Sequence, residues 1–401
     1  MQYSKKNCIF LIGNNKISKK TTIPFDKIIC DFFDNLSKSI LQSKEAKKFP
    51  DLITFGFWCR SSNILKIKNK YSKEKFRLGL GLIFHITPTN IPINFAYSFA
   101  FGVLAGNSNI VRVPSRNYEQ VKIFCEIIKK ILIKKEFKMI KEMNTFIKYN
   151  YSENENLTKF LSSICEARII WGGDKSIEKI KKYPVSVRAR EISFSDRYSL
   201  SILNVSKISK LNKKNYDLLL RNFYNDTYLV DQNACSSPHL IIWVNLGNNS
   251  KDIIEKFWKK LSFLVKKKYN LQEISSIDKY NQQLKNVVRV KELSKTKNFN
   301  NYVNVNTLSK IPNNIESLRG KWGFFYEYEA KNLFFLKKII NSKFQTITYF
   351  GVEKEVFKNF FLKEKPSGID RVVGVGKALD IDIIWDGYDL IQNLSRIVDL
   401  R

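Results

Sequence analysis

The sequence is poor in the side chains that hold metals or form cross-links. Among its 401 residues are only two histidines, His85 and His239, and six scattered cysteines without any C-x-x-C pair. Such usage argues against both a zinc site and a disulfide framework. We therefore expect no metal and a reducing, cytoplasmic environment.

Long apolar runs are also missing. The most apolar stretch, residues 91–113, is interrupted by Asn94, Arg112 and several glycines and serines. It therefore predicts a buried helix followed by a strand, and not a membrane span. The first residues contain a short apolar patch that is inadequate for a signal peptide. We expect no insertion into a membrane.

Positive charge is in excess. Lys and Arg number 69 against 37 Asp and Glu, a net charge of +32. A basic surface attracts nucleic acid, anionic lipid, or the phosphates and acidic carrier proteins that accompany acyl thioesters. However, the lysines are spread along the chain, and heavy use of Lys, Asn, Ile, Phe and Tyr is typical of an AT-rich genome. Because no arginine-rich or aromatic-interleaved motif stands out, we expect no nucleic-acid partner.

Strand and helix patterns alternate through the first half of the chain and predict an α/β fold. Residues 80–86 form an apolar run with the length of a buried strand, and a helix over 93–105 and a strand over 109–113 follow. An amphipathic helix comes after Pro114, and a strand over 167–171 precedes another helix. This alternation predicts a doubly wound sheet.

A lysine-rich shift in composition marks the boundary to a second domain. We predict a first domain over 1–205, whose first residues are weakly patterned, and a second domain over 206–365. The segment 366–401 is expected to pack back on the body. The second domain contains a strand over 240–244 and a polar stretch over 267–301 to which the sequence assigns no element.

Cys235 differs from the other five cysteines in its surroundings. It lies in a polar turn, N-A-C-S-S-P, directly before a predicted strand. A nucleophilic thiol needs access and nearby donors that favour the thiolate, which backbone N–H groups of the turn, Asn233 and Ser236 are suited to supply. A structural cysteine is the alternative. His239, close by in sequence, fits either a Cys–His pair or an ordinary strand position.

Three further segments carry weaker signals. The loop F-H-I-T-P-T-N-I-P places Asn90 where its amide could donate to an oxyanion, although an ordinary turn favours the same residues. Gly172 and Gly173 stand at a strand-to-helix junction that suits a pyrophosphate, yet the adjacent Asp174 would repel one and is an ordinary helix cap. Arg112 ends a strand and could reach a ribose or a 2′-phosphate. No G-x-G-x-x-G fingerprint follows a strand.

In combination, these segments resemble a known family. Their order is similar to that of the LuxC-type long-chain acyl-CoA reductases, a divergent branch of the aldehyde dehydrogenase superfamily. The resemblance runs from about Phe49 to the C-terminal residue. The segments that carry it are FPDLITFGFWCR, LGLIFHITPTNIP, YSFAFGVLAGNSNIVRVPS, RIIWGGD, FSDRYS, DQNACSSP, QTITYFGV, GIDRVVGVGKAL and WDGYDL.

The resemblance implies an aldehyde dehydrogenase-like fold, with a Rossmann-type cofactor domain over 1–205 and an α/β catalytic domain over 206–365. It implies that Cys235 accepts the acyl group and that Asn90 stabilises the oxyanion. The implied reaction is NADPH-dependent reduction of a fatty acyl thioester to its aldehyde. The acyl donor would be acyl-CoA or an acylated carrier or synthetase protein, and we expect a homo-oligomer.

The resemblance also implies a set of cofactor-binding residues. Arg112, Pro114 and Ser115 lie near the superfamily's G-N-T-V-V-L-K-P-S motif, although one extra residue separates Arg112 from Pro114 here. Gly172 and Gly173 lie near the superfamily's second cofactor turn.

One departure from the superfamily bears on the direction of the reaction. The general-base glutamate of the superfamily opens the motif E-L-G-G-K-S-P. In E-I-S-F-S-D-R-Y-S the lysine position is taken by Arg197, which puts Ser193 rather than Glu191 at the glutamate's place. This loss suits a reductase, because a dehydrogenase must deprotonate water to hydrolyse its acyl-enzyme.

Other functions remain open at this point. An NAD(P)-dependent aldehyde dehydrogenase that oxidises its substrate is the nearest alternative, followed by a catalytically inactive scaffold and by a basic nucleic-acid-binding protein. The sequence does not specify acyl chain length, the choice of acyl donor, the general base, the oligomeric state or the pathway.

Overall fold

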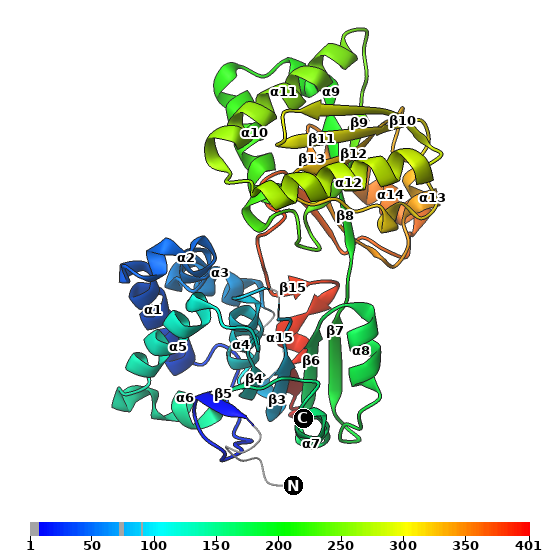
Figure 1. Ribbon diagram of the computed structural model, residues 1–401. Coiled ribbons are helices and arrows are strands. Elements are labelled where there is room, and N and C mark those ends of the chain that lie inside the picture. The colour runs from blue at the N-terminus through cyan, green and yellow to red at the C-terminus, as the bar shows by residue number, and fades with distance from the viewer. Residues whose placement is uncertain (1–7, 72–75, 90) are drawn as a thin grey trace. The chain divides into compact units, whose positions relative to one another are not determined.

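The chain forms two compact units in a computed structural model that describes residues 8–71, 76–89 and 91–401 (Figure 1). Unit 1 comprises Met1–Ser195 and Asp382–Arg401, and unit 2 comprises Asp196–Ile381. Each unit has a sheet and hydrophobic clusters of its own.

Unit 1 is built on a six-stranded sheet of order β1-β5-β4-β3-β6-β7. All neighbouring pairs are parallel except β1 with β5. The central strands are short runs buried on both faces, which is typical of parallel sheets covered by helices. The bounds are β1 (Ile9–Ile12), β3 (Leu82–Ile86), β4 (Ser108–Arg112), β5 (Asn144–Lys148), β6 (Ala167–Trp171) and β7 (Arg190–Phe194).

Helices cover both faces of this sheet. On one face α7 and α8 pack against Phe84, Ile110 and Ile147. On the other face Phe95 of α4 makes edge contacts with Phe124 of α5 and with Phe146 of β5. The helices are α1 (Lys27–Gln42), α2 (Pro50–Trp58), α3 (Ser61–Lys70), α4 (Asn94–Leu104), α5 (Glu119–Ile131), α6 (Lys138–Met143), α7 (Glu155–Ile164) and α8 (Asp174–Lys181), with short turns η1 (Ala46–Lys48) and η2 (Lys135–Phe137).

The strand order of unit 1 reverses at β3. The chain leaves β3 through α4 to β4 on one side, and returns from β5 through α7 to β6 on the other side. In doubly wound sheets, ligands bind beyond the carboxyl ends of the strands at such a reversal. The predicted doubly wound sheet is therefore confirmed, and its carboxyl edge is where a cofactor is expected.

Unit 2 is built on a seven-stranded sheet of order β10-β11-β12-β9-β8-β13-β14. Only the edge pair β10 with β11 is antiparallel, and the remaining pairs are parallel. The bounds are β8 (Tyr198–Asn204), β9 (Pro238–Val244), β10 (Leu293–Phe299), β11 (Val303–Leu308), β12 (Phe324–Glu329), β13 (Phe344–Phe350) and β14 (Arg371–Gly374).

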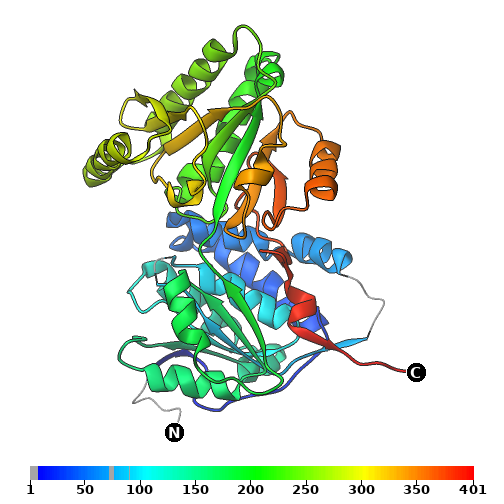
Figure 2. The same cartoon turned by 90° about the vertical axis from the view of Figure 1, so that its right-hand side faces the viewer.

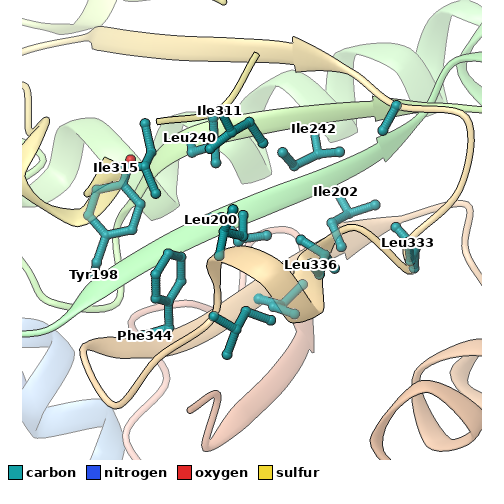
Figure 3. Close-up of a cluster of buried hydrophobic side chains, with 14 of the residues drawn as sticks. Tyr198, Leu200, Ile202, Leu240, Ile242, Ile311, Ile315, Leu333, Leu336 and Phe344 are labelled. Atoms are coloured by element: carbon teal, nitrogen blue, oxygen red, sulfur yellow. The ribbon is translucent and has the colours of Figure 1, made fainter. Parts of the chain in front are cut away.

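Two hydrophobic clusters lie on opposite faces of the unit 2 sheet. One combines Ile241 and Trp243 with residues of α9, α10 and α11. The other combines Leu200, Leu240 and Leu336 with residues of α13 and α14 (Figure 3). The helices are α9 (Val205–Ser209), α10 (Lys213–Thr227), α11 (Ser250–Lys268), α12 (Glu273–Arg289), α13 (Leu336–Ile339) and α14 (Lys354–Glu364), with short turns η3 (Tyr228–Val230) and η4 (Ile315–Ser317).

The structure corrects the predicted domain boundaries. β8 pairs with β9 and β13, so unit 2 begins at Asp196, and a first domain over 1–205 ends too late. The lysine-rich segment after β8 contains α9 and the start of α10, whose lysines are exposed. The lysine-rich composition therefore reflects solvent-facing helices and not a boundary between domains.

The segment 366–401 is divided between the units. β14 pairs with β13 in unit 2. From Asp382 onward the chain belongs to unit 1, where β17 (Ser395–Ile397) pairs with β2 (Arg77–Gly79) and the C-terminal segment, red in Figure 2, runs along this unit. Between them lie the hairpin of β15 (Ile384–Trp385) and β16 (Tyr388–Asp389) and the helix α15 (Leu390–Asn393).

The predicted local elements agree well with the structure. The strands expected over 80–86, 109–113, 167–171 and 240–244 are confirmed as β3, β4, β6 and β9, and the helix expected over 93–105 is α4. Among the helices of the described residues, none is both long enough and apolar enough to cross a membrane.

Candidate active site

Cys235 lies in the loop between η3 and β9 of unit 2 and is half-buried. Its backbone carbonyl accepts a hydrogen bond of 2.6 Å from the hydroxyl of Ser199 on β8. The backbone N–H of Thr346 on β13 donates to the same hydroxyl at 3.1 Å. The loop is thereby anchored to two neighbouring strands of the sheet.

The buried side chain of Gln232 fixes the start of this loop. Asp231 and Gln232 both adopt left-handed backbone conformations, with φ of 54° and 59°, which non-glycine residues adopt only where the surroundings compensate. The Gln232 amide donates to the carbonyls of Pro238 and Phe324 at 3.0 and 3.1 Å, and its oxygen accepts from the N–H groups of Gly323 and Phe324, both at 3.1 Å. Its hydrogen-bonding capacity is used fully, so the turn that carries Cys235 is held rigidly.

A charged pair lies beside the thiol. The Sγ atom of Cys235 is 4.0 Å from Oδ1 of Asp196, and the same carboxylate oxygen accepts from Nη1 of Arg319 at 2.7 Å. Arg319 also donates to the carbonyl of Arg197. A carboxylate disfavours a neighbouring thiolate and a guanidinium favours it, so this pair sets the local field at the sulfur.

Neither Asp196 nor Arg319 was predicted from the sequence as part of the site. Asp196 belongs to F-S-D-R-Y-S and takes the place of the second glycine of E-L-G-G-K-S-P when Arg197 is aligned with the lysine. This replacement of a glycine by a charged residue was the one feature of the sequence that could have indicated a role for Asp196. Arg319 lies in the segment between η4 and β12, and no local pattern connects it with Cys235.

His239 is not suited to a thiolate–imidazolium pair. It lies on β9, is completely buried and stacks on Tyr198 with 5.4 Å between ring centroids. Burial, and secondarily the charge of Arg319, lowers the pKa of His239 to about 3. The imidazole is therefore neutral at physiological pH, which favours the alternative of an ordinary strand histidine.

The other cysteines are poor nucleophiles. Burial raises the pKa of Cys8 to about 11, raises those of Cys125 and Cys165 to about 12, and also raises those of Cys30 and Cys59. They remain protonated at neutral pH, whereas attack requires the thiolate. All six cysteines lie in the described part of the chain, and none of them forms a disulfide.

Four of the predicted cofactor residues follow strands at the carboxyl edge of the unit 1 sheet. Pro114 and Ser115 follow β4, and Gly172 and Gly173 follow β6. Both strands are parallel neighbours of β3. Asn90, the predicted oxyanion donor, lies outside the described residues, and its role stays a prediction from the resemblance.

A pocket of ≈ 490 Å³ opens at this edge. It is lined by Thr89 after β3, Ser115 and Arg116 after β4, and Tyr149 and Asn150 after β5, together with Ile9, Tyr118 and Lys148. Arg116 and Lys148 contribute two positive charges. The pocket thus combines polar groups and cations, which suits a phosphate-bearing ligand.

Arg112 has a different position from its neighbours. Its side chain is buried at the end of β4, where Nη1 donates to the carbonyl of Thr87 at 3.1 Å and the guanidinium lies 5.2 Å from the ring centroid of Tyr149. Within the described residues its Nε has no hydrogen-bond partner. Arg112 therefore braces the strand ends behind the pocket, while Arg116, which sequence reasoning overlooked, lines it.

The turn after β6 leaves open space in front of α8. A Cβ atom at Gly173 would meet no heavy atom within 4 Å, and one at Gly172 would lie 3.6 Å from Cβ of Ser176. Asp174 occupies the first turn of α8, and its negative charge disfavours phosphate there. A phosphate group of a cofactor therefore fits the pocket lined by Arg116 and Lys148 better than the first turn of α8.

The candidate base Glu191 is engaged in ion pairs. It lies on β7, where its carboxylate accepts from Nε of the buried Arg168 at 2.8 Å and lies 3.8 Å from Nζ of Lys181. The hydroxyl of Ser193, at the place of the superfamily's glutamate, is buried without a partner among the described residues. Neither position offers an unpaired carboxylate.

Among the residues that the structure describes, no group of three or more His, Cys, Asp or Glu side chains is arranged to hold a metal ion.

A sequence model of one protein family, described as acyl-CoA reductase (LuxC), matches residues 62–398. The chain belongs to this family. Membership of the acyl-CoA reductase (LuxC) family, with the fold described above, makes the protein an oxidoreductase that acts on an aldehyde or acyl group. The family predicted from the order of segments is confirmed. No curated protein sequence matches the chain significantly.

Solved structures of aldehyde dehydrogenases share the fold of this LuxC family member. A salicylaldehyde dehydrogenase from Pseudomonas putida G7 matches with a TM-score of 0.65 at 9% identity, over 94% of this chain and 86% of that one. An NAD-dependent benzaldehyde dehydrogenase from Corynebacterium glutamicum gives 0.60 at 10% identity, over 94% and 85%. Aldehyde dehydrogenase 21 from Physcomitrella patens gives 0.59 at 12% identity, over 94% and 85%. The predicted aldehyde dehydrogenase-like fold is confirmed.

Proposed function

We propose that this acyl-CoA reductase family member reduces a long-chain fatty acyl thioester to the aldehyde with NADPH, through an acyl group carried on Cys235. The observation that carries the proposal is the position of Cys235. Its thiol is half-buried on a rigid loop beside the Asp196–Arg319 pair, whereas burial holds the other cysteines in the protonated form.

The first step forms a thioester on the protein. The Cys235 thiolate attacks the acyl carbon, and the new S–C bond replaces the bond to the departing thiolate of the donor. Ser199 and Gln232 hold the loop in place during the attack. The donor is acyl-CoA or an acylated carrier or synthetase protein, and the net charge of +32 favours such anionic partners.

When bound, a dihydronicotinamide would supply a hydride to the acyl carbon. The alkoxide formed on Cys235 would then collapse, which breaks the S–C bond, releases the aldehyde and restores the Cys235 thiolate. Arg116, Lys148 and Ser115 would hold the 2′-phosphate of this cofactor, because they line the cationic pocket at the carboxyl edge of the unit 1 sheet. A 2′-phosphate on the adenosine ribose would gain most from two cations, which supports NADPH over NADH.

The ion pairs of Glu191 support reduction over oxidation. Hydrolysis of an acyl-enzyme needs a base that deprotonates water. The Glu191 carboxylate is occupied by Arg168 and Lys181, and Ser193, at the place of the superfamily's glutamate, has no carboxylate. Neither residue offers a free base, and slow hydrolysis would leave the acyl-enzyme available to hydride.

The test is acylation of purified protein by radioactive long-chain acyl-CoA. We expect a hydroxylamine-sensitive label on wild type and on the control Cys30→Ala, whose cysteine is also half-buried, and none on Cys235→Ala. A hydroxylamine-sensitive label that persists in Cys235→Ala would contradict the proposal. NADPH oxidation measured across a panel of acyl-CoA chain lengths then defines the substrate, and Cys235→Ala should oxidise none.

A further inference from the structure

The polarity of α12 is the reverse of that expected for a surface helix. A surface helix normally turns its apolar face to the core and its polar face to solvent. On α12 the buried side chains are Ser275, Lys279, Gln283 and Asn286. The exposed apolar side chains, each at least 48% exposed, are Ile274, Ile277, Tyr280, Leu284, Val287 and Val288.

Hydrogen bonds fix this orientation of the helix. Nζ of Lys279 donates to the carbonyls of Asn301 and Trp322 at 2.7 and 2.9 Å. The amide of Asn286 donates to the hydroxyl of Tyr326 on β12 at 2.6 Å. Rotation of α12 that buried its apolar face would break these bonds and leave the partner groups without hydrogen bonds beneath an apolar surface.

Gln283 adds a further connection to the edge of the sheet. Its amide exchanges hydrogen bonds with Asn298 on β10, at 2.9 and 3.0 Å, and Asn298 in turn accepts from Asn304 on β11 at 2.9 Å. Figure 1 shows α12 lying across the sheet of unit 2. The polar face is already hydrogen-bonded to this sheet, which leaves the apolar face for another surface.

The exposed apolar residues have the spacing of a helix–helix seam. Ile277, Tyr280, Leu284 and Val287 follow one another at intervals of three, four and three residues. This is the heptad spacing with which two helices pack side by side. An apolar stripe of this length on a single face marks an interaction site rather than scattered surface residues.

Charged residues beside the stripe are divided between its two halves. Glu273 and Asp278 are exposed in the first half, and Lys285 and Arg289 are exposed in the second half. An identical helix that runs antiparallel would therefore place acidic residues opposite basic ones along the whole seam. A two-fold axis between two copies of one chain produces this antiparallel arrangement.

We propose that α12 is a self-association surface, on which a second copy of this chain docks its own α12 antiparallel around a two-fold axis near residue 282. Ile277 then packs against Val287 of the second copy, and Tyr280 packs against Leu284. Asp278 lies near Lys285 and Arg289 of the second copy. The proposal rests on α12 alone and does not depend on the proposed function.

A lipid surface is a weaker candidate for this face. Membrane-surface helices carry an excess of Lys and Arg around their apolar side. The exposed charges on α12 sum to zero, with Glu273 and Asp278 against Lys285 and Arg289, so this helix itself offers anionic lipid no electrostatic attraction.

The first test is the mass of the full-length protein in solution, measured by sedimentation velocity over a range of concentrations. We expect wild type to associate and Leu284→Glu to lose one association step, with a dissociation constant raised at least about a hundredfold. Leu362→Glu, at an exposed leucine of α14, should associate like wild type. A monomeric wild type, or an unchanged mass for Leu284→Glu, would overturn the proposal.

Charge reversal tests the identity and direction of the partner without changing the apolar seam. Glu273→Lys with Asp278→Lys makes α12 basic throughout, and Lys285→Glu with Arg289→Glu makes it acidic throughout. Each double variant should dissociate by itself, and an equimolar mixture should associate again. If each still associates by itself, or the mixture does not associate, antiparallel self-pairing is excluded. Flotation with anionic vesicles that depends on Leu284, with unchanged mass, would instead identify a lipid surface.

Discussion

The Sγ atom of Cys235 lies 4.0 Å from Oδ1 of Asp196, whose other close partner is Nη1 of Arg319 at 2.7 Å. The carboxylate and the guanidinium have opposite effects on a thiolate, and each offsets the other. This arrangement makes the reactivity of Cys235 sensitive to removal of either charge.

We predict opposite effects for two substitutions at this pair. Asp196→Asn leaves the guanidinium uncompensated, so alkylation of Cys235 by iodoacetamide at neutral pH should become about threefold to tenfold faster. Arg319→Gln leaves the carboxylate uncompensated and should slow it by a similar factor. Alkylation is followed by mass spectrometry of the Cys235 peptide. Asp370→Asn, which removes the partner of Arg197 instead, serves as the control; a change of the same sign in both test variants would contradict the prediction.

A second prediction concerns the rigidity of the loop. Gln232→Leu preserves the volume of the buried side chain but leaves the carbonyl of Pro238 and the backbone N–H of Gly323 without their partner. The free energy of unfolding should fall by about 3 kcal/mol, because each buried unpaired group costs about 1–3 kcal/mol. Urea denaturation measures the loss. The neighbouring exposed Asn233→Ala should have a midpoint close to that of wild type, and an equal loss in both variants would refute the role given to Gln232.

The fold was predictable from the sequence where an element carries its own signal. The run L-I-F-H-I of β3 is buried on both faces, and its short length favours a central parallel strand over a buried helix. Even His85 fits this environment, since its ring nitrogens pair with Ser98 and Asn109 and burial lowers its pKa to about 4.

α12 was missed for a physical reason. It lies inside the stretch 267–301, which is rich in Asn, Gln and Lys and therefore gives no sign of a core helix. Its interface with the sheet is made of Lys279, Gln283 and Asn286, so the usual association of apolar residues with burial is inverted.

The site was only partly predictable because its contacts join distant segments. Cys235 carries a local signal, a polar turn before a strand. Asp196 and Arg319 come to it through the pairing of β8 with β9 and through the loop before β12. The proximity of Asp196 and Arg319 to Cys235 depends on the order of the strands in the sheet, and local sequence patterns do not specify this order.

Asp226 should make stability depend on pH. It lies on α10, is buried, and accepts from the backbone N–H groups of Gly376 and Ala378 at 2.6 and 2.9 Å. Burial raises its pKa from 3.8 to about 7, against the opposing effect of these two hydrogen bonds. Because the pKa is raised in the folded state, the contribution to stability is complete below pH 4 and is lost as the pH rises through 7.

The measurement compares wild type with Asp226→Asn by urea unfolding at pH 5 and pH 8. The advantage of wild type over the variant should shrink by about 3 kcal/mol between the two pH values, because about two pH units of the titration lie in this range and each is worth about 1.4 kcal/mol. Asp217→Asn, on the same helix, should show no such change. A difference between wild type and Asp226→Asn that is constant with pH would show that Asp226 does not titrate in this range.

The last prediction concerns the cationic pocket of unit 1, where Arg116 lies in the segment after β4 and Lys148 ends the neighbouring parallel strand β5. If these cations hold a 2′-phosphate, Arg116→Ala and Lys148→Ala should each weaken NADPH binding about tenfold, since each removes one charge-assisted contact. NADH has no 2′-phosphate, so its affinity should change little. Calorimetric titration with both cofactors measures this independently of turnover, and the exposed Lys122→Ala on α5 controls for the loss of positive charge. Equal losses for NADPH and NADH would place the 2′-phosphate elsewhere and leave these residues as general phosphate contacts.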